Sequence, residues 1–131
     1  MTFLFDTNVI SELFRRTPNP GVIAFAQQVR LIRISAISLD EILFGLAAKP
    51  KPRILKRFEI FVEKQCVVLS VNAETARRSG KLRGQLQRKG ISRCQADMMI
   101  AAIAQQHRLT LVTRNVKDFE LCDIEIINPF S

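Results

Sequence analysis

The sequence contains no tryptophan and no tyrosine, and every one of its nine aromatic residues is a phenylalanine. It also contains only one histidine, His107. A histidine-dependent nucleophile and an imidazole-rich zinc site are therefore not expected. The lack of tyrosine and tryptophan also removes the side chains that most often stack on nucleic-acid bases, so any binding of that kind would depend on charge.

Cysteines are few and scattered. Cys66, Cys94 and Cys122 form no CxxC pair, and their odd number favours reduced thiols over a disulfide framework. No apolar run approaches the ~20 residues of a membrane span. The N-terminal segment has no basic residue before its apolar run, which Asp6 interrupts, so we expect no signal peptide and a cytoplasmic location.

Basic residues outnumber acidic residues in this sequence. The chain has 20 Lys and Arg against 12 Asp and Glu, a net charge of +8, and its pI is near 10.1. This excess favours a polyanionic partner, nucleic acid first and an anionic membrane surface second. The alternative is a basic surface that serves solubility alone.

The length of 131 residues predicts a single domain over 1–131. Strands are expected at 2–6, 33–35, 66–71, 109–113 and 124–128, and helices at 8–16, 21–30, 38–47, 53–64, 73–89 and 95–106. The connections between strands are too long for hairpins. The pattern therefore predicts an α/β fold with a mostly parallel central sheet of four to five strands and helices on both faces.

Several acidic residues lie just after a predicted strand or at the start of a predicted helix. Asp6 ends the first strand, Glu41 lies in the first turn of the helix that follows the second strand, and Asp97 lies in the first turn of the apolar helix "QADMMIAAIAQQ". Asn115 and Asp118 come just after the strand at 109–113. Because ligands bind along the carboxyl edge of a parallel sheet, we expect these side chains to meet there.

Each acid also has a purely structural explanation. Ser38 and Glu41 fit the S-x-x-E capping box. Asp97 would complement the dipole of its helix, Asp6 could begin a helix, and Asp118 could lie in a surface turn. These explanations weaken when the acids are taken together, because two carboxylates ~4 Å apart repel by about 4 kcal/mol at an effective dielectric constant of about 20.

A cation would relieve this repulsion. Hard oxygen ligands without imidazole or thiolate suit Mg²⁺ or Mn²⁺. An acidic metal pocket in a basic protein indicates hydrolysis of a phosphodiester bond, with the basic surface holding the polyanion.

Three segments in order resemble the PIN-domain ribonucleases of the VapC type, the toxin half of bacterial toxin–antitoxin pairs, including the FitB-like branch. They are "FLFDTNVISEL" at 3–13, "ISAISLDEILFG" at 34–45 and "ISRCQADMMIAAIAQQHRLTLVTRNVKDFE" at 91–120. The resemblance covers almost the whole chain. It implies a three-layer PIN-like fold and a Mg²⁺- or Mn²⁺-dependent endoribonuclease.

By this resemblance, Asp6, Glu41 and Asp97 are the metal-binding and catalytic acids. Asp118 is carried over as the fourth catalytic acid, although many family members have an aspartate where this chain has Asn115, so the choice between the two stays open. Small polar residues match positions beside the acids and would orient them or a water. They are Thr7, Asn8, Ser38 and Thr113, with Asn115 as a further candidate.

Basic side chains would hold the RNA backbone. The candidates are Arg15, Arg16, Arg77, Arg78, Lys81, Arg83, Arg88, Lys89, Arg93, Arg114 and Lys117. The helix predicted at 73–89 carries many of them, and the alternative is that this helix presents an ordinary solvated face.

The resemblance further implies a homodimer and a cognate antitoxin that covers the acidic pocket, often with an arginine among the carboxylates. Apolar residues of the first two helices would form such an interface or the plain core. Two other functions stay open: a PIN nuclease that matures RNA or cuts DNA, and a non-catalytic nucleic-acid-binding module whose acids only cap helices.

Overall fold

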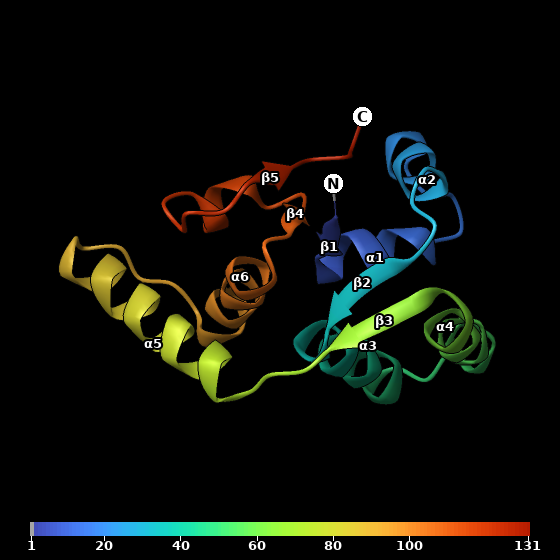
Figure 1. Cartoon of the computed structure of the whole chain (residues 1–131). Helices are drawn as coiled ribbons and strands as arrows, with labels where there is room; N and C mark the ends of the chain where they lie inside the picture. The colour runs from blue at the N-terminus through green and yellow to red at the C-terminus, as the bar shows by residue number, and fades with distance from the viewer. Residues whose placement is uncertain (1) are drawn as a thin grey trace.

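The computed structural model describes residues 2–131, and a five-stranded parallel sheet lies at its centre (Figure 1). The strands are β1 (Phe3–Phe5), β2 (Ile32–Ser35), β3 (Cys66–Leu69), β4 (Thr110–Val112) and β5 (Ile126–Ile127). Their order in the sheet is β3-β2-β1-β4-β5, and every neighbouring pair is parallel. The predicted α/β class and strand number are confirmed, with β1 at the centre.

Residues 2–131 also form six helices and one 3-10 helix. They are α1 (Thr7–Leu13), α2 (Pro20–Gln27), α3 (Ala36–Ala48), α4 (Pro52–Gln65), α5 (Ala73–Arg88), α6 (Gln95–His107) and the 3-10 helix η1 (Val116–Phe119). The six predicted helices are all present, and η1 was not predicted. In the described part of the chain no helix is both long and apolar enough to cross a membrane.

Two hydrophobic cores lie on opposite faces of the sheet. On β1, Leu4 packs into the core shared with α5 and α6, whereas Phe5 packs into the core shared with α1, α2 and α4. Leu111 and Val112 of β4 divide in the same way. Successive side chains of a strand point to opposite faces, so the apolar runs at 3–5 and 110–112 supply both cores.

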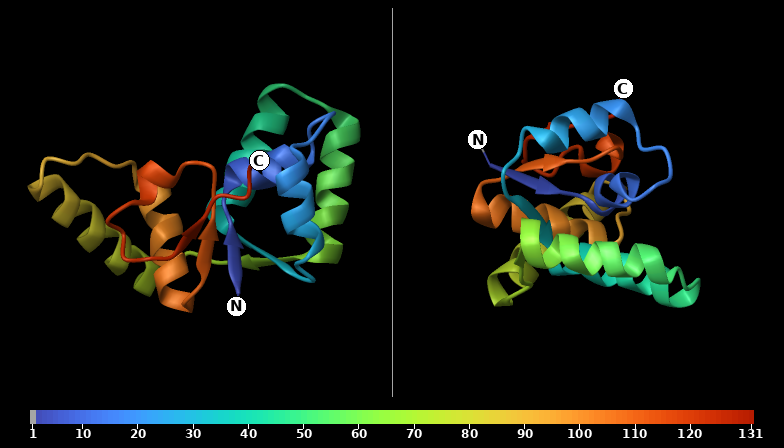
Figure 2. Two further views of the ribbon diagram at one scale, coloured as in Figure 1. Left: turned by 90° about the horizontal axis from the view of Figure 1, so that it is seen from above. Right: turned by 90° about the vertical axis from the view of Figure 1, so that its right-hand side faces the viewer.

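The helix α5 lies outside α6 and not on the sheet (Figures 1 and 2). Leu82 and Leu86 of α5 pack into the α6 core. At its start, Thr75 donates a hydrogen bond to Gln106 of α6 over 2.6 Å. This position explains why α6 is apolar nearly all round: the sheet covers one side and α5 the other.

The apolar residues of the first helices belong to the core. Ile10 and Val22 are fully buried, and Leu13, Phe14 and Phe25 pack against the same cluster. This outcome favours the core alternative over a free interface, although Phe14 is only half-buried and also lines a groove described below. Phe44 of α3 is the exception among the phenylalanines, because its side chain is 73% exposed.

The C-terminal segment is fastened to the start of α2. Asn19, the N-cap residue of α2, accepts hydrogen bonds from the backbone N–H groups of Gly21 and Ser131 at 3.0 and 3.1 Å. A Cβ atom on Gly21 would overlap the carbonyl oxygen of Pro129 and lie 2.9 Å from Ser131 N. Only glycine lets the two segments approach this closely.

We therefore expect Gly21→Ala to destabilise the protein by about 1–3 kcal/mol, because the added methyl overpacks this contact. Gly45→Ala is the matched control. An added Cβ at Gly45, inside α3, meets no atom within 4 Å, so we expect a stabilisation of up to about 1 kcal/mol from helix propensity. Urea unfolding of both variants checks the prediction, and a neutral Gly21→Ala would contradict it.

Candidate active site

Asp6 lies at the carboxyl end of the central strand and is only 4% exposed. It is the N-cap residue of α1, and its Oδ1 accepts a hydrogen bond from the Thr7 backbone N–H at 2.8 Å. Its Oδ2 accepts from Thr113 Oγ1 at 2.7 Å and from Asn8 Nδ2 at 3.1 Å. Asp6 therefore does begin a helix, but two of its three partners are side chains, one of which comes from the end of β4.

The pKa of Asp6 is raised above its usual value, first because burial disfavours the charged form and further because the carboxylates of Asp97 and Glu41 repel it. The hydrogen bonds from Thr113 and Thr7 oppose this rise. A carboxyl group with a raised pKa stabilises the fold only while it is protonated, and this contribution is lost as the pH rises through that pKa. At pH values above that pKa, ionised Asp6 thus lowers the stability of the protein.

Glu41 reaches the site from α3 and is exposed. Its Oε1 lies 2.6 Å from Thr7 Oγ1, which also lies 2.9 Å from Ser38 Oγ. The capping-box interpretation of Ser38 and Glu41 is wrong. Ser35 is the N-cap residue of α3, and its Oγ accepts from the Ser38 backbone N–H at 3.0 Å, which places Ser38 in the first turn. Because α3 begins at Ala36, the prediction that Glu41 lies in the first turn is also wrong, and Glu41 lies in the second. Glu41 is thus free of any capping role.

Asp97 lies in the first turn of α6 and is half-buried. Cys94 is the N-cap residue of α6, and its Sγ accepts a hydrogen bond from the Asp97 backbone N–H at 3.5 Å. The pKa of the Cys94 thiol is raised, first by partial burial and also by the negative charges of Asp97 and Glu41. Three acids distant in sequence thus act on one another at one edge of the sheet.

Thr113 and Asn8 connect the end of β4 to the start of α1. Thr113 Oγ1 accepts from Asn8 Nδ2 at 3.3 Å and from the Asn115 backbone N–H at 3.0 Å. Asn8 Oδ1 accepts from the Arg114 backbone N–H at 3.0 Å. This network fixes the Asp6 carboxylate and the loop that follows β4 in one arrangement.

Asn115 adjoins the acidic site through its backbone, whereas Asp118 lies one turn further on, in η1. Within residues 2–131, no hydrogen bond joins the Asp118 carboxylate to the three acids. Its backbone carbonyl instead accepts from Arg93 Nε at 3.1 Å, and Arg93 also donates to the Lys117 carbonyl at 3.2 Å. The guanidinium of Arg93 therefore holds η1 against the loop before α6.

The other basic candidates differ in whether their side chains already make an ion pair or a ring contact within the chain. Arg15 donates to buried Glu12 at 3.2 Å, and Arg78 lies 3.4 Å from Glu74. Arg114 stacks over the ring of Phe130, 4.8 Å from its centroid. The exposed candidates for which the structure gives no ion pair or ring contact within residues 2–131 are Arg16, Arg77, Lys81, Arg88, Lys89 and Lys117.

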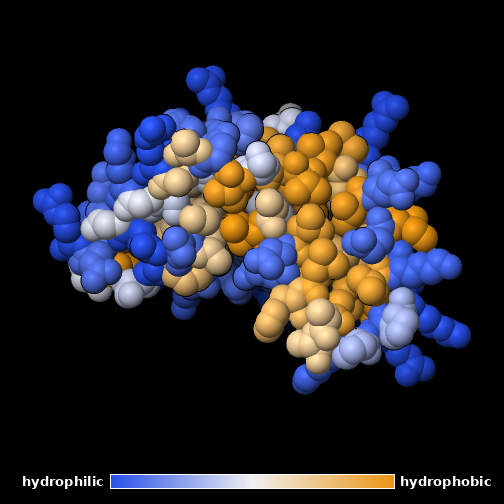
Figure 3. Space-filling model, turned by 90° about the horizontal axis from the view of Figure 1, so that it is seen from below, coloured by the Kyte–Doolittle hydropathy of each residue, from blue (hydrophilic) through white to orange (hydrophobic). Residues whose placement is uncertain are grey.

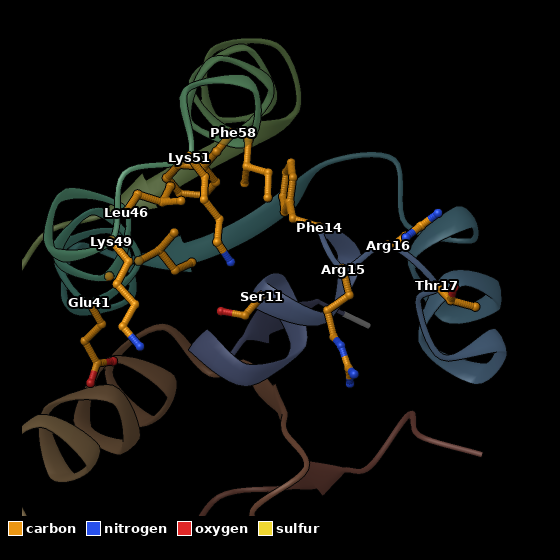
Figure 4. A pocket seen from close by; sticks show the side chains of 13 residues that line it. Ser11, Phe14, Arg15, Arg16, Thr17, Glu41, Leu46, Lys49, Lys51 and Phe58 are labelled. Atoms are coloured by element: carbon orange, nitrogen blue, oxygen red, sulfur yellow. The ribbon is translucent and has the colours of Figure 1, made fainter.

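A groove of about 800 Å³ runs beside the acids between α1, α3 and α4 (Figure 4). Phe14, Leu46 and Phe58 contribute apolar surface to it. Cationic side chains lie along the groove, and Glu41 lines one end. The cations are Arg15, Arg16, Lys49 and Lys51. The groove is therefore continuous with the acidic site through Glu41.

The acidic side chains fit a divalent cation that is held in an open site by only one or two carboxylates. In the span from residue 2 to residue 131, no three histidine, cysteine or carboxylate side chains lie together closely enough to enclose one ion. Mg²⁺, however, is usually held by one or two carboxylates together with water and substrate phosphates. The buried Asp6 carboxylate, repelled by Asp97 and Glu41, suits such an open site and not a closed cage.

Sequence reasoning missed two residues of the site, Ser35 and Cys94. Both are N-cap residues that fix the first turn carrying a functional side chain. The sequence could have predicted Ser35 as an N-cap residue, since it stands three residues before Ser38 in "SAIS" at the end of a strand. Cysteine is not a common N-cap residue, so nothing in the sequence indicated that Cys94 has this role.

The sequence matches the PIN domain family over residues 3–123. It is 34% identical to the VapC ribonuclease Y4jK of Sinorhizobium fredii, over 97% of this chain and 96% of that protein. It is 33% identical to the toxin FitB of Neisseria gonorrhoeae, over 97% of each chain.

Solved structures show the same similarity. The crystal structure of FitAcB from Neisseria gonorrhoeae superposes with a TM-score of 0.85 at 29% identity and covers 98% of each chain. A toxin–antitoxin complex from Klebsiella pneumoniae gives a TM-score of 0.78 at 27% identity and covers 99% of each chain. The fold, and not only the motif, is therefore shared.

Replacing Thr113 by valine should raise the pKa of Asp6 further, because it removes a hydrogen bond that favours the ionised form. Above the pKa of Asp6 we expect a destabilisation of about 1.5–3 kcal/mol that shrinks as the pH falls through that pKa. Thr113→Ser keeps the hydroxyl and serves as the control. A ¹³C NMR titration of the Asp6 carboxyl measures the shift, and an unchanged or lower pKa would refute the account.

Proposed function

Because the chain belongs to the PIN domain family, we propose that it is a metal-dependent endoribonuclease that acts as the toxin of a type II toxin–antitoxin pair. The observation that carries this proposal is the convergence of Asp6, Glu41 and Asp97 at one edge of the sheet, in a chain of net charge +8. A basic surface attracts the polyanion, and the acids form the reactive centre.

Asp6 and Asp97 are the residues that would hold Mg²⁺ or Mn²⁺. When bound, such an ion neutralises charge on the phosphate and makes water more acidic. Thr113, Asn8 and the Thr7 backbone N–H keep the Asp6 carboxylate in a fixed orientation. This orientation limits the rearrangement needed when the substrate arrives.

Glu41 would take a proton from the attacking water. It is exposed, within hydrogen-bond distance of Thr7 Oγ1, and needed for no helix cap. A carboxylate that is solvated on one side can accept a proton from an attacking water and release it to solvent. For the fourth position the geometry favours Asn115, whose backbone N–H joins the Thr113 network, over Asp118.

The antitoxin would lie in the groove between α1, α3 and α4. This groove offers apolar surface from Phe14, Leu46 and Phe58 and is flanked by four cations. An amphipathic segment with acidic residues complements it. Because Glu41 lines both the groove and the acidic site, a segment seated here would also cover the acids, as an inhibitor must.

A second copy of the chain would cover the apolar face formed by α3, β3 and α4 (Figure 3). Exposed apolar side chains from these elements include Phe44 of α3, Leu55 of α4 and Val68 of β3. The strand β3 is also an edge of the sheet. Large exposed apolar patches mark interaction surfaces, and a homodimer agrees with the resemblance to VapC toxins.

One observation favours a non-catalytic nucleic-acid-binding module as the second candidate. Position 115 lacks the carboxylate that many PIN domains have, so the site carries one negative charge fewer. The raised pKa of Asp6 argues against this candidate, since an acid that served only as a helix cap would not need to be buried near two other carboxylates.

Asp97→Asn should keep the fold but abolish RNA cleavage, because it removes one carboxylate of the pair that would hold the ion. In the wild type, Mn²⁺ at 100 times its dissociation constant should add about 2.7 kcal/mol of stability. This gain should be largely lost in the variant. Cleavage of total RNA and thermal melting with and without Mn²⁺ measure both effects.

Induced alone in a bacterium, the wild type should arrest growth, and the Asp97→Asn protein should not. Relief of the arrest by an adjacent small gene would identify the antitoxin, whereas unimpaired growth would favour an RNA-maturing nuclease. Cleavage by Asp97→Asn at the wild-type rate would overturn the assignment of the site.

Two substitutions on opposite sides of α3 separate the two proposed interfaces. Leu46→Glu places a charge in the groove and should weaken antitoxin binding at least tenfold while leaving the oligomeric state unchanged. Phe44→Glu should convert the dimer to a monomer while leaving antitoxin binding intact, so each variant is the control of the other. Light scattering and calorimetric titration measure the two outcomes. If the two variants exchanged their effects, or if both had the same effect, the assignment of the antitoxin and the second copy to different surfaces would be contradicted.

A further inference from the structure

Most of the net positive charge of the protein lies in one segment. Residues 73–93, which form α5 and the loop that follows it, contain seven Lys and Arg and one acid, Glu74. This segment thus accounts for +6 of the net charge of +8, and the rest of the chain is close to neutral. The charge is not a general feature of the surface.

Within α5, the free cations lie on the face turned away from α6. Residues 77, 81 and 88 are four and seven positions apart, a spacing that places them on one side of a helix. The buried side chains of α5, Leu82 and Leu86 among them, lie on the opposite side against α6. Arg77, Lys81 and Arg88 are all exposed.

Nothing in residues 2–131 obstructs this outer face. A Cβ atom added at Gly80 or Gly84 would meet no atom within 4 Å. Arg78, by contrast, lies 3.4 Å from Glu74 and is half-exposed. The outer face therefore presents three cations with no acidic partner in the described chain, beside open helix backbone.

We propose that the outer face of α5, through Arg77, Lys81 and Arg88, is a second RNA-binding surface that contacts phosphates of the substrate away from the cleaved bond. This proposal rests on the proposed ribonuclease function. Since α5 lies one helix layer beyond α6, a substrate that reaches both α5 and Asp97 must extend past the acidic edge. The surface thus favours an extended or folded RNA over a short oligonucleotide.

The composition of the face distinguishes RNA from other anionic partners. A helix that binds a membrane surface inserts apolar side chains, and the apolar residues of α5 are buried against α6. A protein interface needs an apolar or aromatic centre, and the outer face of α5 offers arginine, lysine, glutamine, glycine and alanine, with Glu74, the ion-pair partner of Arg78, as its one acid. Binding of an RNA phosphate backbone, by contrast, requires only cationic side chains within reach of the phosphates.

The test measures binding and not cleavage. In an Asp97→Asn background without divalent ions, a synthetic 20-base-pair RNA hairpin is titrated with the protein over a range of salt concentrations. The triple variant Arg77→Gln, Lys81→Gln, Arg88→Gln removes the three cations and keeps good helix formers. The matched control removes three exposed cations elsewhere: Arg30→Gln, Lys56→Gln, Lys64→Gln.

We expect the α5 variant to reduce the slope of log K against log salt by about 2–3, one unit for each lost phosphate contact. The control variant should keep the slope within about one unit of the parent. Equal slopes for both variants, or an α5 variant with the parent slope, would overturn the proposal. Loss of binding to phosphatidylserine vesicles with RNA binding intact would also overturn it, in favour of a membrane surface.

Circular dichroism melting of each variant ensures that the fold is unchanged. Failure of the proposed function would appear as an absence of RNA cleavage by the wild type, which this binding measurement does not use. The two proposals therefore fail independently.

Discussion

The burial of the Asp6 carboxylate at the end of the central strand is the constraint on which the site depends. A buried charge is costly unless it is hydrogen-bonded or paired. Here three donors, Thr7 N–H, Asn8 Nδ2 and Thr113 Oγ1, compensate only part of that cost, and Asp97 and Glu41 add repulsion. The protein thus holds a group whose ionised form opposes folding, a feature typical of functional sites.

The arrangement follows from the parallel sheet. All five strands end at one edge, and α1, α3 and α6 each begin there. Asp6 is the N-cap residue of α1, Asp97 lies in the first turn of α6, and Glu41 lies in the second turn of α3. The position of each acid is therefore fixed by the packing of a different helix. The two apolar cores on either face are what make this edge rigid enough to hold like charges together.

Charge is separated across the molecule. The acids gather at the edge of the sheet, the groove beside them is flanked by cations, and most of the remaining positive charge lies on α5, outside α6. An RNA held along α5 and an antitoxin seated in the groove would approach the acids from different sides. The same acidic edge would then be reached by the substrate from one direction and by its inhibitor from another.

The sequence by itself determined the order and type of the six helices and five strands, though not η1, and it indicated the three acids as candidates for one site. Apolar periodicity is local, and the acids adjoin strongly apolar segments, so both could be recognised without the structure. The capping interpretation drawn from the sequence failed at Ser38, because Ser35, three residues before the expected start of α3, already caps that helix.

Only the tertiary structure decided how these pieces act on one another. It showed that Thr113 restrains Asp6 across 107 positions of the chain, that Arg93 holds η1 instead of facing solvent, and that α5 packs on α6 and not on the sheet. These relations join residues distant in sequence through side-chain packing and hydrogen bonds. A local pattern does not encode such relations, since they arise only when separate elements are brought together by a common core.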